Sequence, residues 1–369
     1  MQKVSIFIPV YRESELLEEL LDGLIKDPYR KKEIFVVIDK PTKKSLKVVE
    51  KFKKKVKFIL NGKRKGKVNA LNEAVKYSSG DIFLFLDSDV KLPNNKSNFL
   101  KTLVEEMKNA DIVEIKKKII QDSFLSRIVN YDYLSFNFVN WLFSKFIKKC
   151  IGINGAAFAI RREVFKELGS FEREISEDLD IAIKSFLKNK KFSYLKNIEV
   201  LNKTHSSWKK WFEQRKRWSI GLALWIKKYF RDLITIVKEY PQVILPAIIF
   251  LFPTLLPLFL SFLFSTTLFE KISAIFLFFI LMKLSFLIPF LSFSSITLML
   301  IRNLFLFLTS FFITSILFFG ISRKMNYRFN LLEFAFYFFI YCPFWFFILL
   351  VNFGRVFIFN KHDVKNWKI

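Results

Sequence analysis

Two aspartates at the end of a short apolar run are the residues whose spacing points most directly to chemistry. Asp87 and Asp89 follow the strand-like segment DIFLFL. In an extended backbone, residues i and i+2 point to the same side, so the two carboxylates would repel each other unless a cation lay between them. A hard ion with oxygen ligands, Mg²⁺ or Mn²⁺, would relieve this repulsion and neutralise a bound diphosphate. Such a pair also occurs at ordinary turns, so the rest of the sequence must decide between the two interpretations.

A second acidic segment and a basic one add to this pair. Residues 176–180 (SEDLD) begin an amphipathic helix, where free N–H groups stabilise a carboxylate as an anion. An ionised Asp178 could act there as a general base towards a sugar or lipid hydroxyl, although an ordinary helix cap has the same pattern. The stretch 62–72 (GKRKGKVNALN) places Lys67 at a helix start, where it could meet phosphate or a base edge. It lacks the Gly-Lys-Ser/Thr ending of a P-loop, which argues against ATP hydrolysis.

Short β-branched runs alternate with amphipathic helical stretches between residues 3 and 89, which is the pattern of a parallel α/β sheet. The expected strands and helices are Val4–Pro9, Glu15–Ile25, Glu33–Ile38, Val56–Leu60, Lys67–Tyr77 and Asp81–Leu86. In such sheets, ligands bind beyond the carboxyl ends of the strands. Because Tyr11, Asp39 and the Asp87/Asp89 pair fall at those ends, we expect them to share one edge of the sheet.

Seven motifs, taken in order, resemble those of the family 2 glycosyltransferases with a GT-A fold, over roughly residues 3–220. They are VSIFIPVYRESE, VVID ending in Asp39, GKVNALNEAV, GDIFLFLDSD, NGAAFAIRREVF, SEDLD and QRKRW. The last motif, Gln214 to Trp218, is similar to the Gln-x-x-Arg-Trp signature of the cellulose, hyaluronan and poly-N-acetylglucosamine synthase branch. The resemblance implies an α/β catalytic domain with a Rossmann-like mixed sheet.

The same resemblance implies a role for each matching residue. The residues expected to hold the nucleotide's base and ribose, with a lysine nearby, are Pro9, Tyr11, Glu13, Asp39 and Lys67. Asp87 and Asp89 would carry the diphosphate and a Mg²⁺ or Mn²⁺ ion, and Asp178 would be the base of an inverting single displacement. Relatives often have consecutive acidic residues where this chain has Asp39-Lys40-Pro41-Thr42, so uracil and guanine both stay open as bases.

Three residues of the last motif would lie over the site, namely Gln214, Arg217 and Trp218. Arg217 would counter the charge of the leaving diphosphate, and Trp218 would stack on the acceptor sugar. Trp218 also belongs to an aromatic stripe, so a packing or interfacial role stays open for it.

Two segments, 130–149 and 207–229, place aromatic residues at helical intervals and lysines elsewhere. Both patterns are typical of helices that lie in the membrane interface with Trp and Lys at headgroup level. The alternative for each is a helix that packs against the core and has a solvated basic face.

The composition indicates a basic front followed by a membrane anchor. The chain has 60 Lys+Arg against 33 Asp+Glu, yet 52% of its residues are apolar, which excludes a disordered protein. Of the 48 Phe residues, 29 lie after Pro241, and residues 1–241 carry a net charge of +20 out of +27. Uncharged stretches predict about four spans, near 243–265, 272–292, 300–320 and 332–353. Lys283 interrupts the second of these, where it would be costly and therefore functional or snorkelling.

The domain organisation follows from these features. We expect a GT-A domain over residues 1–205, an interfacial amphipathic region over 206–240, transmembrane helices over 241–355 and a basic tail over 356–369. A front domain in the cytoplasm and a multi-pass location in the cell membrane agree with the basic tail under the positive-inside rule. Two cysteines and two histidines argue against a disulfide framework or a zinc site.

The expected function is transfer of a sugar from a nucleoside-diphosphate sugar, with UDP-sugars favoured, to a growing polysaccharide or glycolipid. A polyprenyl-phosphate glycosyltransferase is the alternative within the same class of enzyme. A basic membrane protein that binds polyanions is the non-enzymatic alternative, because basic surfaces attract polyanions whatever their fold. The acidic motifs and the membrane anchor argue against nucleic acid as a partner. The oligomeric state stays open.

Overall fold

The structure, a computed structural model, describes residues 2–93, 98–263, 271, 275 and 295–361. The chain divides into two compact units. The first comprises Met1–Ile244 together with Phe347–Ile369, and the second comprises Leu245–Phe346. We describe each unit by itself.

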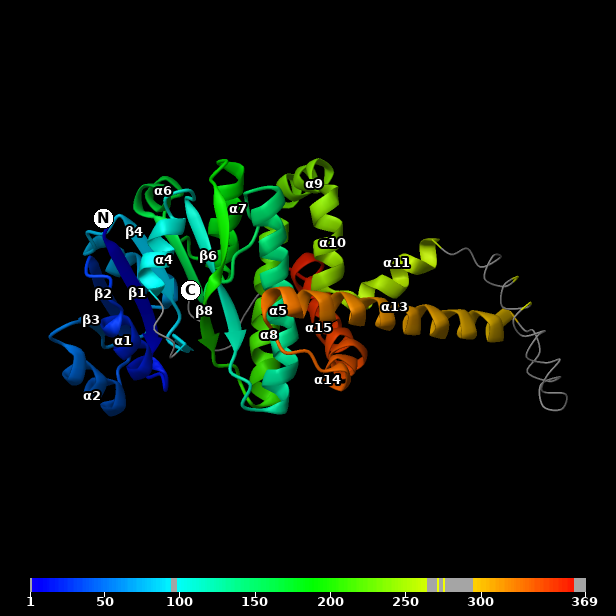
Figure 1. The fold of residues 1–369 in the computed structure, drawn as a ribbon, viewed down its shortest axis with the longest axis horizontal. Coiled ribbons are helices and arrows are strands. Elements are labelled where there is room, and N and C mark those ends of the chain that lie inside the picture. The colour runs from blue at the N-terminus through cyan, green and yellow to red at the C-terminus, as the bar shows by residue number, and fades with distance from the viewer. Residues whose placement is uncertain (1, 94–97, 264–270, 272–274, 276–294, 362–369) are drawn as a thin grey trace. The chain divides into compact units, whose positions relative to one another are not determined.

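The first unit is built on an eight-stranded mixed sheet with the order β3-β2-β1-β4-β7-β6-β8-β5 (Figure 1). Its first half is parallel and consists of β1 (Val4–Tyr11), β2 (Lys32–Asp39), β3 (Lys57–Asn61) and β4 (Ile82–Leu86). These four strands were expected from the sequence, and the structure confirms them with ends shifted by one or two residues. Their carboxyl ends meet at one edge.

The second half of the sheet makes it mixed. Strand β7 (Ala157–Arg161) runs antiparallel to β4 and to β6 (Ile112–Ile119), and β8 (Phe192–Asn202) runs parallel to β6. The short β5 (Val90–Lys91) pairs antiparallel with β8. The predicted α/β fold with a mixed sheet is therefore confirmed.

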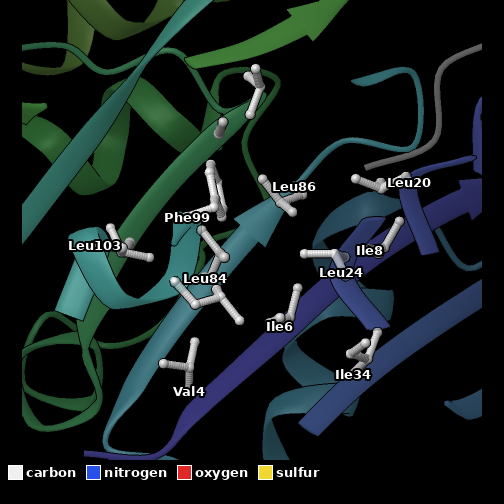
Figure 2. Close-up of a cluster of buried hydrophobic side chains, with 14 of the residues drawn as sticks. Val4, Ile6, Ile8, Leu20, Leu24, Ile34, Leu84, Leu86, Phe99 and Leu103 are labelled. Atoms are coloured by element: carbon white, nitrogen blue, oxygen red, sulfur yellow. The ribbon is translucent and has the colours of Figure 1, made fainter. Parts of the chain in front are cut away.

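Both faces of the central strands are covered, which explains why they are almost continuously apolar. On one face, Ile6 and Ile8 of β1 pack with Leu84 of β4 beneath α1 (Leu17–Lys26) and α4 (Phe99–Glu106) (Figure 2). On the other face, the ring of Phe7 stacks on Phe35 and Phe85 and meets Phe83 edge-on, at centroid distances of 5.3–5.4 Å. The helices α2 (Lys43–Phe52), α3 (Lys67–Lys76) and α6 (Arg162–Glu167) complete this part.

Helix α5 (Phe124–Phe146) lies against β6 and β8 and is buried on most of its surface. The interfacial interpretation of segment 130–149 is therefore wrong, and the core-packing alternative is right. Aromatic residues at helical intervals also fit a helix buried in the core, and here Phe138 and Phe143 are buried. Several polar side chains of the helix bond to the sheet. Asn137 donates to the carbonyl of Lys117 at 2.7 Å and accepts from its N–H at 3.3 Å, and Asn140 donates to Glu114 at 2.6 Å.

Helix α8 (Trp208–Lys228) contacts α7 (Glu177–Leu187), and part of its aromatic stripe is buried. Trp211 is fully buried, and the indole N–H of Trp225 donates to the carbonyl of Leu179 at 3.1 Å. Trp208 and Phe212 remain exposed. The next helix, α9 (Phe230–Glu239), exposes apolar side chains along one side, namely Phe230, Ile234 and Val237.

The remaining helices are strongly apolar. They are α10 (Pro241–Leu251), η1 (Pro253–Leu255), α11 (Leu256–Leu263), α13 (Ser295–Met325), α14 (Leu331–Phe336), the π-helical η2 (Tyr337–Tyr341) and α15 (Cys342–Phe357). Among the described residues, Met299–Met325 and Leu331–Phe357 are long and apolar enough to cross a membrane. They correspond to the predicted spans at 300–320 and 332–353.

The structure does not show the other two predicted spans, 243–265 and 272–292, as single long helices. The segment 243–265 is not one helix, because α10 ends at Leu251 and a new turn begins at Pro253. The pair α9 and α10 would count as a third span only with a bend of 112°. The predicted span 272–292, with Lys283, lies outside the described residues apart from single positions.

Candidate active site

A small pocket lies at the carboxyl ends of the parallel strands, where the sequence predicts the site. Its lining combines aromatic and aliphatic side chains with ionisable groups. The lining residues are Pro9, Lys67, Leu71, Phe85, Leu86, Asp87, Gly155, Phe158, Phe171, Glu177 and Asp178. Residues that are far apart in the sequence therefore meet here, including the first aspartate of the Asp87/Asp89 pair and the predicted base.

Lys67 lies at the centre of the ionisable groups. It begins α3, and its Nζ lies 2.9 Å from Asp87 Oδ1 and 3.0 Å from Glu177 Oε1. Burial alone would lower the pKa of this ammonium, but the charges of Asp87, Glu177 and Asp178 raise it above its usual range. Lys67 therefore stays charged, and it links the end of β4 to the start of α7.

Asp178 is held in place by two backbone N–H groups. Gly155 donates to its Oδ2 and Leu179 donates to its Oδ1, each at 2.9 Å. Burial and the neighbouring charge of Glu177 raise the pKa of Asp178 to about 6, against the opposing effect of Lys67 and the two N–H groups. A carboxylate with this pKa is ionised at neutral pH and is basic enough to accept a proton.

The Asp87/Asp89 pair has the chemistry of a hard-cation site. The backbone N–H of Asp87 donates to the carbonyl of Ala156 at 2.9 Å, which fixes the end of β4 against the start of β7. Partial desolvation and the charge of Asp87 raise the pKa of Asp89, and the solvent that still reaches this exposed residue weakens the effect. Two oxygen donors that repel each other fit Mg²⁺ or Mn²⁺, which would offset that repulsion.

Arg217 of α8 belongs to the same group of charges. Burial lowers the pKa of its guanidinium, while four carboxylates raise it, namely those of Glu177, Asp87, Asp178 and Asp89. The helix therefore brings the arginine of the Gln-x-x-Arg-Trp motif close to the acidic residues. Gln214 and Trp218 of the same helix are partly buried. Their predicted contacts with a nucleotide and an acceptor stay predictions.

The residues expected to hold the base and ribose lie at the ends of β1 and β2. Tyr11 pairs with Asp39 in the strand register and is 46% exposed. Asp39 is only 4% exposed and accepts three hydrogen bonds, from Asn61 Nδ2 at 2.9 Å and from the N–H groups of Lys65 and Gly66 at 2.8 Å each. Glu13 accepts a hydrogen bond from the hydroxyl of Thr42 at 2.6 Å.

A buried ion pair that the sequence did not indicate anchors α8. Arg215 donates to Asp132 of α5 at 2.6 Å, and both side chains are almost fully buried. The Arg215 guanidinium also lies 4.5 Å from the centroid of the Trp218 ring. The sequence hinted at each partner, because the QRKRW motif contains two arginines and Asp132 interrupts an apolar stretch. Nothing in the sequence pattern shows that Arg215 pairs with Asp132.

A second buried pair lies behind the pocket. Lys117 Nζ contacts Glu114 Oε1 at 2.6 Å, with 1% of each side chain exposed. The same carboxylate accepts a longer hydrogen bond of 3.4 Å from the N–H of Asn154, next to the glycine that holds Asp178. The alternation of side chains along a strand could not reveal this pair. Strand β6 (IVEIKKKI) contains three consecutive lysines, and the pattern does not show which of them is buried.

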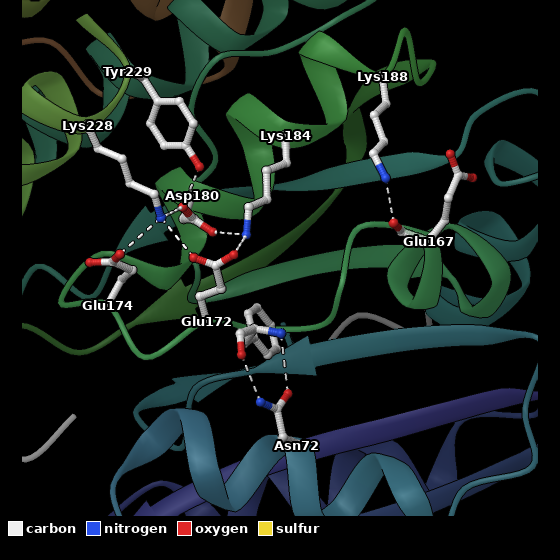
Figure 3. Close-up of polar contacts among 10 residues, drawn as sticks. Asn72, Glu167, Glu172, Glu174, Asp180, Lys184, Lys188, Lys228 and Tyr229 are labelled. Atoms are coloured by element: carbon white, nitrogen blue, oxygen red, sulfur yellow. Dashed lines mark hydrogen bonds and ion pairs between the residues drawn. The ribbon is translucent and has the colours of Figure 1, made fainter.

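An acidic cluster beside α7 lies apart from the Asp87/Asp89 pair. Carboxylate oxygens of Glu172, Glu174 and Asp180 lie within 4.8 Å of one another. Two ammonium groups already occupy this space (Figure 3): Lys228 reaches all three carboxylates at 2.8–3.0 Å, and Lys184 contacts Asp180 at 2.7 Å. The cluster is therefore an ion-pair network that ties the end of α8 to α7.

Comparison with known proteins agrees with this geometry. Residues 5–169 match the profile described as "Glycosyl transferase family 2". This part of the chain is therefore similar to glycosyl transferase family 2. The matched region contains the Asp87/Asp89 pair and Lys67, whereas Asp178 and Arg217 come after it.

Two curated relatives match more of the chain, each at 24% identity. The "Probable glycosyltransferase YdaM" of Bacillus subtilis is 24% identical over 254 residues, which is 65% of this chain and 60% of the relative. The "Poly-beta-1,6-N-acetyl-D-glucosamine synthase" of Staphylococcus epidermidis is 24% identical over 229 residues, or 60% of this chain and 55% of the relative. The chain thus spans well under two thirds of both relatives.

A solved structure shows a weaker likeness. The mannosyltransferase PcManGT from Pyrobaculum calidifontis, in complex with GDP-Man and Mn²⁺, has a TM-score of 0.48 and 21% identity. The match covers 63% of this chain and 65% of that one.

Proposed function

We propose that this chain is a membrane-anchored glycosyltransferase that moves a sugar from a nucleoside-diphosphate sugar to a hydroxyl group. One observation carries the proposal, which is the convergence of four carboxylates and two cations at the strand ends. The carboxylates are Asp87, Asp89, Glu177 and Asp178, and the cations are Lys67 and Arg217. An anionic leaving group needs the cations, and a hydroxyl nucleophile needs a base.

The proposed reaction is a single displacement that inverts the anomeric carbon. Asp178 takes the proton of the acceptor hydroxyl while the hydroxyl oxygen bonds to the anomeric carbon. At the same time, the bond from that carbon to the diphosphate oxygen breaks. The diphosphate leaves with the electron pair, and Lys67 and Arg217 offset its growing charge. A Mg²⁺ or Mn²⁺ ion held by Asp87 and Asp89 would supply further positive charge to the diphosphate.

The acceptor proposed is a growing polysaccharide or a glycolipid, with a UDP-sugar as the favoured donor. The name of the curated relative from Staphylococcus epidermidis, a polysaccharide synthase, supports a polymer. Two helices long enough to cross a membrane support an acceptor held at the lipid surface. The basic tail supports a catalytic domain on the cytoplasmic side, because the positive-inside rule favours that side for lysine and arginine. A polyprenyl phosphate is the alternative acceptor, and it should be tested in the same assay as the other acceptors.

Release of nucleoside diphosphate tests the proposal. The full chain in detergent would be offered UDP-sugars and GDP-sugars with membrane lipids, with and without Mn²⁺. We expect metal-dependent release that Asp178→Asn lowers by roughly 10²- to 10⁴-fold. The matched control is Asp22→Asn on α1, which is not among the residues that line the pocket and should keep wild-type release.

Each result has a distinct meaning. Product size then separates a polymer from a single transfer to a lipid. Release that Asp178→Asn leaves unchanged would remove Asp178 as the base. A folded protein that binds no nucleoside diphosphate would overturn the proposed function as a whole.

A further inference from the structure

The carboxylate of Asp39 is engaged inside the protein. It accepts a hydrogen bond from the side chain of Asn61 and two from the backbone N–H groups of Lys65 and Gly66, and only 4% of the residue is exposed. A carboxylate offers about four acceptor positions, so one at most is left for a ligand. Asp39 is therefore better placed to fix the loop 62–66 than to read a nucleotide base.

The loop that Asp39 fixes carries a different side chain to the base region. The Arg64 guanidinium lies 4.3 Å from the centroid of the Tyr11 ring. Tyr11 is 46% exposed and ends β1, two residues after the pocket residue Pro9. Arg64 also lies three residues before Lys67, whose ammonium faces the diphosphate position of the proposed function.

An arginine and an aspartate would select different nucleotide bases, because an arginine offers only hydrogen-bond donors and an ionised aspartate offers only acceptors. A guanidinium has five N–H donors and no acceptor, so it pairs with carbonyl oxygens and with ring nitrogens that accept. Uracil presents two carbonyl oxygens, and guanine presents O6 beside N7, which an arginine can engage with two parallel bonds. Cytosine and adenine place an amino group, which is a donor, on the corresponding edge.

We propose that Arg64, supported by the ring of Tyr11, is the residue that selects the base of the nucleotide donor, favouring uracil or guanine over cytosine and adenine. This inference rests on the proposed function, because it concerns the donor of that same reaction. It assigns to Asp39 the task of holding the loop. Arg64 thus determines specificity, and Asp39 acts through Arg64 as a positioning residue.

Calorimetric binding to the full chain in detergent tests the inference, with UDP, GDP, CDP, ADP and inorganic pyrophosphate as probes and Mg²⁺ present. We expect wild type to bind UDP or GDP roughly tenfold or more tightly than CDP and ADP. Arg64→Met should remove most of this difference and leave pyrophosphate affinity unchanged. Arg30→Met, an exposed arginine before the amino end of β2, is the matched control and should change neither quantity.

Asp39→Asn gives a second, independent measurement. If Asp39 holds the loop that carries Arg64, this variant lowers the melting temperature and also reduces the preference for UDP or GDP, as Arg64→Met does. A changed base preference at an unchanged melting temperature would make Asp39 the direct reader and overturn the inference.

The remaining outcomes separate this inference from the proposed function. Arg64→Met with an unchanged ratio among the four nucleotides, or with an equal loss for pyrophosphate, overturns the role of Arg64 alone. Equal wild-type affinity for all four nucleotides does the same. A folded wild type that binds none of them overturns the proposed function, and this inference with it.

Discussion

Asp178 combines two properties that a catalytic base needs, a fixed orientation and a suitable pKa. Its two backbone hydrogen bonds fix the carboxylate, and burial beside Glu177 raises its pKa to about 6. Because the base must be ionised, we expect kcat/KM to fall about tenfold per pH unit below about pH 6 and to level off above it. A pH profile of nucleoside diphosphate release checks this. Glu177→Gln, which removes the neighbouring charge, should move the acidic limb to lower pH, and an unmoved limb would contradict the assignment.

Gly155 leaves no room for a side chain. A Cβ at this position would lie 2.9 Å from Asp178 Oδ2 and 3.2 Å from Asp178 Cβ. Gly155→Ala must therefore displace the carboxylate by tenths of an ångström, and we expect kcat to fall by roughly 10- to 100-fold, with less change in nucleoside diphosphate affinity.

The matched control is Gly354→Ala in α15, where a Cβ would meet nothing within 4 Å. It should leave kcat at the wild-type value. If Gly155→Ala kept full activity, the contact between Gly155 and Asp178 would have no part in catalysis.

At the scale of the element, α8 depends on one buried ion pair. Arg215→Met leaves Asp132 as a buried charge without its guanidinium, which typically costs about 3–5 kcal/mol. We expect a melting temperature lower by several degrees, together with lost activity, because Arg217 is carried on the same helix. Arg217→Met should lose activity with little change in melting temperature. The double variant Arg215→Met/Asp132→Leu should recover stability, and a double variant as unstable as the single one would contradict this account.

Comparison of the elements shows what a sequence can predict. Strand β4 and helix α7 were predicted because their apolar periodicity agrees with a motif at the same place. Helix α5 was misinterpreted because aromatic residues at helical intervals fit a buried helix as well as an interfacial one, and the bonds from its asparagines to β6 leave no signal in the sequence.

The same limit applies to the site. Asp39 was correctly placed at a strand end, yet its three donors come from residues 61–66, and no local pattern shows that they converge on it. The partnership of Arg215 with Asp132 joins residues 83 positions apart, which periodicity cannot detect. Position along the sheet was therefore predictable, whereas the partners of each charged group were not.

At the scale of the whole molecule, the basic front should attract an anionic donor. Residues 1–241 carry a net charge of +20, and the donor carries a diphosphate. We expect kcat/KM to fall several-fold between low and high salt while kcat changes little, because salt screens long-range attraction over about 10 Å at 0.1 M.

Two double variants of α2 separate local from total charge. Lys43→Gln/Lys44→Gln lies at the end of the helix nearest the strand ends, and Lys53→Gln/Lys54→Gln lies just past its other end. All four lysines are exposed, and both variants remove the same charge. A larger fall in kcat/KM for the first pair is expected. An equal fall would mean that only the total charge matters.

One continuous stretch of helices serves two purposes in this chain. Helix α8 carries Arg217 among the acidic groups, and it is followed directly by α9 and by the apolar α10, which meets α9 at a bend of 112°. Only Tyr229 and Tyr240 separate the three helices, so a short and largely helical run of backbone joins the arginine of the QRKRW motif to the first strongly apolar helix.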